Sequence, residues 1–277
     1  MRQLLHIEWI KQSNFGAFKV LLILHFSLFC LMMGVLSFAD FNGMEIGKVM
    51  LSFPNSWSVT TWIASWFNFL LGIIGIIIVG NEFSYLTFRQ QVLIGQSRSR
   101  ILHGKLLVML ILSIYGFLLT FSSSAITGLV FTTDWDMVNL WDSSYLILIY
   151  LLQTISYMVF GMFIALLFRN NALSICMFLL YGIIIEPLIR VFLPYSVSSF
   201  FPMKVISNLT PMPKFLDMFS EMAGVSVQGG GSFSNTFSSQ LPQIQSNLSE
   251  GTLIIVAILY IGLFYALSQY FVRSRNL

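Results

Sequence analysis

The chain carries few polar side chains, and those with chemical potential fall into three groups. The first is a polar and basic stretch at residues 81–105, which separates two strongly apolar runs. The second is Glu186 and Arg190, which lie one helical turn apart in an apolar run and would pair on one face of a helix or gate its outer end. The third consists of isolated polar residues within other apolar runs: His25, Asn68 and Gln153.

None of these groups forms a catalytic or metal-binding pattern. The nearest approach to a phosphate-binding loop is Gly104-Lys105, but Ser99 replaces its first glycine and Leu106 its final serine or threonine. The three histidines are scattered, and the two cysteines offer neither zinc spacing nor a disulfide framework. We therefore predict a protein that is not an enzyme and that binds no metal or cofactor of its own.

Composition indicates where the chain resides. Of its 277 residues, 57% are hydrophobic and 9% are charged, and the mean hydropathy is +0.83. A soluble domain carries about 25% charged residues, so this composition predicts an integral membrane protein. The net charge of +3 is spread along the chain, which argues against a nucleic-acid partner.

Six apolar runs are each close to the ~20 residues that cross ~30 Å of hydrocarbon as a helix. We predict an all-α membrane protein, a single domain over residues 1–277. Residues 1–16 are expected to form an interfacial helix, and residues 194–251 a long outer loop with short helices, one of them starting at Thr210-Pro211. The predicted spans are residues 17–39, 60–80, 105–131, 144–168, 172–193 and 252–272.

Charge predicts the orientation, because lysine and arginine favour the cytoplasmic side. With the N-terminus inside, ten of the 14 basic residues are cytoplasmic and four, namely Lys48, Arg190, Lys204 and Lys214, are outside. An even number of spans then places both termini in the cytoplasm. The ten inner residues are Arg2, Lys11, Lys19, Arg89, Arg98, Arg100, Lys105, Arg169, Arg273 and Arg275.

The isolated polar residues of the spans have two readings. His25, Asn68 and Gln153 can hold helices together or line a translocation path. Small residues at Ala64 and Gly72, four residues on either side of Asn68, predict close packing of the second span against another helix.

The cytoplasmic stretch at residues 82–100 has its own order. Glu82 ends the second span, a short amphipathic segment follows, and Gly95 terminates it. Lys105 then opens the third span. This order resembles the ABC-2 type transporter permeases, although Leu86 replaces the glycine that usually precedes the threonine, and Gly95 stands where proline is common. The matching residues are Glu82, Thr87, Arg89, Gly95, Ser97, Arg98 and Lys105.

The resemblance implies the membrane half of an ATP-binding cassette exporter in a bacterial inner membrane. A separate ATPase, in two copies, would bind ATP and Mg²⁺, and a second permease copy or a paralogue would complete a dimer. The segment after Glu82 would be the coupling helix, and short elements at residues 199–224 would lie near the exit. The ATPase contact is expected to involve Glu82, Thr87, Arg89, Gly95, Arg98 and Arg100.

Substrate and alternatives stay open at this point. The 27 phenylalanines and 14 methionines would suit a lipid-like or peptide substrate. An ABC membrane subunit that powers assembly, gliding or signalling would have the same sequence features. A secondary transporter outside the ABC class would instead show internal repeats and ion ligands at mid-membrane depth.

Overall fold

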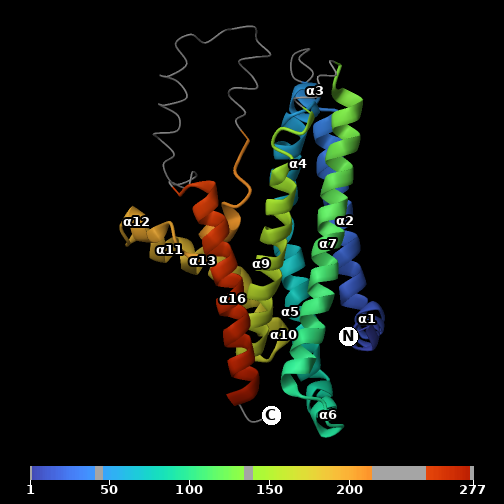
Figure 1. Cartoon of the computed structure of the whole chain (residues 1–277), viewed down its shortest axis with the longest axis vertical. Helices are drawn as coiled ribbons and strands as arrows, with labels where there is room; N and C mark the ends of the chain where they lie inside the picture. The colour runs from blue at the N-terminus through green and yellow to red at the C-terminus, as the bar shows by residue number, and fades with distance from the viewer. Residues whose placement is uncertain (1, 41–45, 134–139, 214–247, 275–277) are drawn as a thin grey trace.

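The computed structural model describes residues 2–40, 46–133, 140–213 and 248–274, and within these ranges all regular structure is helical (Figure 1). Elements α2, α7 and α9 and the last helix, α16, form a bundle. The described elements are α1 Arg2–Ser13, α2 Gly16–Ser37, α3 Ile46–Leu51, α4 Asn55–Trp66, α5 Asn68–Ser84, α6 Thr87–Leu93, α7 Arg98–Phe131, α9 Tyr145–Phe168, α10 Asn171–Leu180, the π-helix η1 Tyr181–Ile185, α11 Glu186–Val191, α12 Tyr195–Ser198, α13 Pro202–Ser207 and α16 Glu250–Ser274.

Five of the described helices are long and apolar enough to cross a membrane, and α4 and α5 pass the same test only as a pair. The five are α2, α7, α9, the continuous Asn171–Val191 helix and α16. The prediction of a multi-pass, all-helical membrane protein is therefore confirmed. The second predicted span, residues 60–80, is wrong as one straight helix, because α4 and α5 meet at 45°.

The bend between α4 and α5 occurs at Phe67, although neither proline nor glycine stands there. The Phe67 N–H donates to the carbonyl of Ala64, three residues earlier, at 3.1 Å, which tightens the turn. Asn68 then starts α5 with its side chain fully buried. A buried side-chain amide needs hydrogen-bond partners, and those partners lie on α9, as described below.

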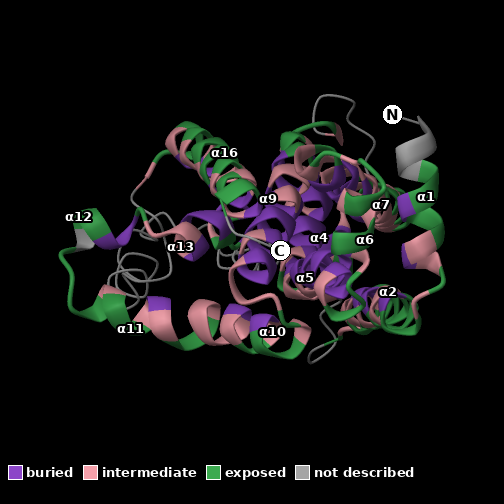
Figure 2. Ribbon diagram, turned by 90° about the horizontal axis from the view of Figure 1, so that it is seen from below, coloured by how far each residue is buried: buried purple, intermediate pink, exposed green. Residues whose placement is uncertain are grey.

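Helix α9 is the centre of the bundle (Figure 2). Of the most apolar 18 residues of α9, 67% are buried, against 17% for α2 and for the Asn171–Val191 helix. Small residues bring α5 against it: a Cβ atom on Gly161 would lie 2.5 Å from the carbonyl oxygen of Gly72, and one on Gly75 2.9 Å from that of Met158. The predicted stripe of small residues in the second span does form a close helix contact.

The stretch at residues 82–100 lies at the same end of the molecule as the first helix and the end of the last one. In Figure 1, α1, α6 and the C-terminal end of α16 occupy the same end of the molecule, while α3 lies at the opposite end. This arrangement is the one expected for an even number of crossings. Helix α7 begins at Arg98, seven residues before the predicted start, because Ser97 caps it by accepting the N–H of Arg100 at 3.4 Å.

The fifth span widens into a π-helix at Tyr181–Ile185. Pro187 lies two residues after it and has no N–H to donate to the preceding turn, and the Glu186 N–H donates to the carbonyl of Tyr181. Two short helices, α12 and α13, lie in the segment after the fifth span. Thr210 lies in irregular structure, and the rest of the helix predicted after it falls at residues 214–224, outside the described part.

Candidate functional site

Four charged side chains meet where α1, α5 and α7 converge, and we call them the inner junction: Glu8, Lys11, Glu82 and Lys105. The Lys105 ammonium lies between the carboxylates of Glu8 and Glu82 and forms an ion pair with each. Lys11 lies 3.0 Å from Glu82 and 3.7 Å from Glu8. Since Lys105, Glu82 and Glu8 are only 2%, 3% and 4% exposed, these charges are almost completely removed from solvent.

The second oxygen of Glu82 holds α6. The Thr87 hydroxyl donates to Oε2 of Glu82 at 2.5 Å, and the Gln91 side-chain amide donates to the same oxygen at 3.3 Å. Both residues belong to α6, so one carboxylate connects α6 to α1, α5 and α7. Removing one partner of a buried ion pair costs about 3–5 kcal/mol, because the other charge is left buried alone, so the loss of either charge here would be strongly destabilising.

Helix α6 is delimited by two left-handed residues. Leu86 precedes it with φ 55°, and Gly95 follows it with φ 95°. Glycine adopts this conformation freely, whereas a residue with a Cβ atom pays roughly 1–2 kcal/mol. Leu86, which stands where the resembled family usually has glycine, is therefore in a strained backbone conformation.

The outer side of α6 presents an apolar surface that we call the tip, composed of Tyr85, Leu86, Leu93 and Ile94. These side chains are 60–82% exposed. The apolar residues of this segment do not share one face, because Leu86 and Leu93 are exposed while Phe88 is buried. Arg89 and Arg100 are exposed near the tip.

The predicted ATPase-contact residues thus divide into two sets. Arg89, Gly95 and Arg100 are exposed, as a contact requires. Glu82, Thr87 and Arg98 serve internal contacts: Glu82 is buried in the inner junction, the Thr87 hydroxyl donates to it, and Arg98 donates to the carbonyls of Val272 and Arg273 at 3.1 and 3.2 Å. Lysine and arginine commonly satisfy the last carbonyls of a helix in this way, so Arg98 ties α7 to the end of α16.

A neutral counterpart to the inner junction joins α5, α9 and the segment after α13. We call it the outer amide network: Asn68, Gln153, Thr154 and Thr210. Asn68 donates to Gln153 at 3.0 Å and accepts from Thr154 at 3.1 Å, and Thr210 donates to Gln153 at 3.2 Å. All four side chains are at most 4% exposed. These mutual bonds support the reading of Asn68 and Gln153 as residues that hold helices together.

Glu186 and Gln153 fix the two ends of α13. The Glu186 carboxylate accepts the backbone N–H groups of Met203 and Lys204 at 2.9 and 2.7 Å, which are free donors in the first turn of α13. Gln153 donates to the carbonyl of Ile206 in the last turn at 2.9 Å. Within the described residues, Glu186 forms no ion pair with Arg190; the predicted pair is replaced by a helix cap.

His25 is the remaining buried polar residue of the sequence prediction. Its ring is 1% exposed and lies between Phe67 and Tyr115, with ring centroids 6.5 and 5.9 Å away. Neither ring nitrogen has a hydrogen-bond partner. His25 therefore packs α2 against the bend and α7. Among the described residues, no group of histidine, cysteine, aspartate and glutamate could hold a metal ion.

These features define a class: a multi-pass helical membrane protein in which buried ion pairs fasten a short helix with an exposed apolar surface. Residues 4–185 match the family model described as ABC-2 family transporter protein. The match covers well over half of the 277 residues, and the chain belongs to that family. A search of curated proteins found no match to the chain. The family implies a permease that works with an ABC ATPase and generally has no catalytic activity of its own.

Proposed function

We propose that this chain is the permease subunit of an ABC exporter in the cytoplasmic membrane of a bacterium, with both termini in the cytoplasm. The family match and the distribution of lysine and arginine support this proposal. Two copies of a separate ATPase bind ATP and Mg²⁺, and two permeases, identical or paralogous, enclose the path. Helices α4 and α5 form one broken span, which makes six crossings.

One observation carries the proposal: the tip exposes Leu93 at 77% and Ile94 at 82% at the end of the molecule where both chain ends lie. An exposed apolar surface of this kind marks a site that binds another protein or a membrane, and we assign it to a protein partner. Arg89 and Arg100 beside it supply charge for complementarity with an ATPase cleft. The tip, rather than Glu82, is therefore the ATPase contact.

Glu82 has a different role in this mechanism. Closure of the ATPase dimer around ATP moves the tip, and the inner junction passes the displacement to α1, α5 and α7 because one carboxylate bonds to all of these helices and to α6. Arg98 extends the connection to α16. Their change in tilt opens the path outward, and the permease itself makes and breaks no covalent bond.

Purification from the native host in a gentle detergent tests the proposal. We expect the wild-type chain to bring an ATP-hydrolysing protein with it, identified by mass spectrometry and by its ATPase activity. The double variant Leu93→Ser with Ile94→Ser should reduce the amount of ATPase roughly tenfold, as loss of an interface anchor does. Its thermal stability should not change, because both side chains are exposed.

Phe38→Ser is the matched control, since Phe38 is 89% exposed at the opposite end of α2 from α1. It removes an equally exposed apolar side chain and should keep the full amount of ATPase. An ATPase that co-purifies equally with the tip variant would show that the tip is not the contact. A wild-type chain that purifies without any ATPase would contradict the proposed function.

A further inference from the structure

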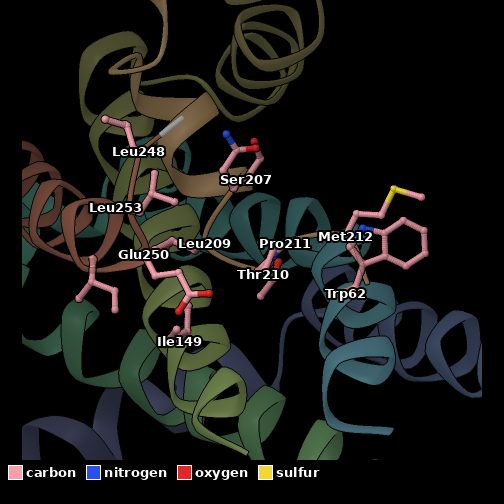
Figure 3. A pocket seen from close by; sticks show the side chains of 12 residues that line it. Trp62, Ile149, Ser207, Leu209, Thr210, Pro211, Met212, Leu248, Glu250 and Leu253 are labelled. Atoms are coloured by element: carbon pink, nitrogen blue, oxygen red, sulfur yellow. The ribbon is translucent and has the colours of Figure 1, made fainter. Parts of the chain in front are cut away.

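A cavity of about 390 Å³ opens beside α16, between α4, α9 and the segment that follows α13 (Figure 3). Its size falls within the range of about 300–1,000 Å³ that is usual for small-molecule sites. Ile149 and Leu253 belong to a buried apolar cluster and give it an apolar floor. In Figure 3, Trp62 and Met212 lie together on one side, and Glu250 lies on the other.

The wall of this cavity is held in place by buried hydrogen bonds. Thr210, which lines the cavity, donates to Gln153, and Gln153 also donates to the carbonyl of Ile206 just before the wall begins. Ile206 lies in the last turn of α13, and the Glu186 carboxylate accepts the backbone N–H groups at the start of that helix. A wall fixed from two spans is formed before a ligand arrives, which reduces the ordering cost of binding.

Two polar groups that line the cavity are available to a ligand: Glu250 is exposed and Asn208 is half-buried. The Glu250 carboxylate accepts a hydrogen bond from the Tyr145 hydroxyl at 3.1 Å but forms no ion pair within the described part of the chain. The side-chain nitrogen of Asn208 is buried and has no hydrogen-bond partner. The cavity therefore offers a site for a cation at Glu250 and one unused polar group at Asn208.

We propose that this cavity binds a cationic amphiphile, whose ammonium group pairs with Glu250 and whose apolar part lies against Trp62 and Met212. A carboxylate that receives an ammonium group forms a charge-assisted hydrogen bond. Tryptophan supplies a large rigid apolar surface, and methionine adapts to apolar ligands of varied shape. The charge of Glu250 disfavours an anionic amphiphile.

The location of the cavity agrees with a role in ligand selection. Most of its lining comes from residues 207–212 and 248–254, which lie beyond the segment matched to the family at residues 4–185. Glu250 starts α16 at the end of that helix opposite the cytoplasmic one (Figure 1). With the proposed orientation, the cavity opens toward the outer membrane surface. Only this last step depends on the proposed function; the binding site itself does not.

Binding is measured on the isolated permease in lipid nanodiscs, without any ATPase, using radiolabelled decylammonium and subtracting the signal of empty discs. We expect saturable binding that unlabelled decylammonium displaces and decyl sulfate does not. Glu250→Gln should weaken binding by about tenfold, the ratio expected when a charge-assisted bond worth about 1.4 kcal/mol is lost. Ile254→Trp, at a half-buried lining position, should fill the cavity and abolish binding while leaving Glu250 in place.

Asp40→Asn is the matched control, because Asp40 is an exposed carboxylate just after α2, outside the cavity lining. It should bind like the wild type. Discs of phosphatidylglycerol alone and discs that also contain phosphatidylethanolamine separate two sources of the ligand: competition by the second lipid identifies a membrane aminolipid, and its absence identifies a free amphiphile. Equal affinity of Glu250→Gln and wild type, or no saturable binding, overturns the proposal, even where the ATPase still co-purifies.

Discussion

The inner junction and the outer amide network solve the same problem with different chemistry. Each gathers four polar side chains, all of them buried except Lys11, and anchors a short helix: α6 at one end of the molecule and α13 about halfway along it (Figure 1). The inner junction uses two carboxylates and two ammonium groups. The outer amide network uses amides and hydroxyls, which carry no net charge.

The difference follows from the cost of removing each group from water. A buried charge without its partner is very unfavourable, whereas a neutral amide that loses one bond costs only a few kcal/mol. The charged cluster therefore tolerates little separation, and its helices should move as one body. The amide network can lose and regain single bonds, which suits helices that bend at Phe67 or shift beside a ligand cavity.

The substitution Lys105→Met should show the difference between the two clusters most clearly. The change leaves Glu8 and Glu82 buried with only Lys11, which lies on the more exposed side at 33% side-chain exposure. We expect a loss of about 3–5 kcal/mol in the free energy of unfolding. The measurement is thermal unfolding in detergent, followed by intrinsic fluorescence.

Lys19→Met provides the comparison, because Lys19 is exposed on α2 and its loss should change stability little. Adding Glu8→Gln to Lys105→Met should recover part of the lost stability by removing one of the stranded charges. If Lys105→Met unfolds at the same temperature as Lys19→Met, the inner junction does not hold these helices together.

Gln153→Leu makes the corresponding change in the outer amide network. It deprives Asn68 and Thr210 of a shared partner and releases the carbonyl of Ile206. We expect a smaller loss, about 1–2 kcal/mol, since buried neutral hydrogen bonds in membrane proteins contribute modestly. In the same nanodisc assay, decylammonium binding should also weaken, because the wall of the cavity loses its support.

The double variant Asn68→Leu with Gln153→Leu tests whether the network acts as a unit. Its loss of stability should be smaller than the sum of the two single losses, because both remove the same hydrogen bond. A loss equal to or larger than that of Lys105→Met would remove the distinction between the charged and the neutral cluster.

Most of the fold could be predicted because hydropathy and the need to pair every backbone amide fix the membrane helices. The bend at Phe67 could not, since no proline or glycine marks it and the residue after it, Asn68, bonds to Gln153 on α9, 85 residues away. Pro187 did mark a disturbance, yet the resulting π-helix depends on the packing around it.

The ATPase contact after Glu82 stays a prediction, and the contacts that Glu82 makes could not be read from the sequence. Charge order located the stretch after Glu82, but a sequence does not show whether a glutamate faces a partner protein or the inside of its own. That Glu82 faces the interior is seen only in the structure, where Lys105 pairs with it and also with Glu8, 97 positions earlier in the chain. Likewise, Glu186 and Arg190 have ideal helical spacing, and the nearby amides of α13 bind Glu186 instead.

The smallest expected effect concerns the strained backbone of Leu86, in the turn that leads into α6. Leu86 holds φ at 55° because the turn into α6 is fixed by Thr87 and Gln91 bonding to Glu82. Leu86→Gly should relieve that strain and raise the free energy of unfolding by up to about 1 kcal/mol, after allowing for glycine's greater freedom in the unfolded chain. Leu86→Asn, which also tolerates left-handed geometry, should stabilise similarly.

Leu93→Asn is the control, since Leu93 is as exposed as Leu86 but has ordinary helical geometry, and it should not gain stability. Thermal unfolding of the three variants side by side gives the answer. If Leu86→Gly destabilises the protein, the Leu86 side chain contributes more by its contacts than its backbone costs. The strained turn at Leu86 would then be a required part of the tip, and the hydrogen bonds of Glu82 to α6 would offset the strain of its left-handed backbone.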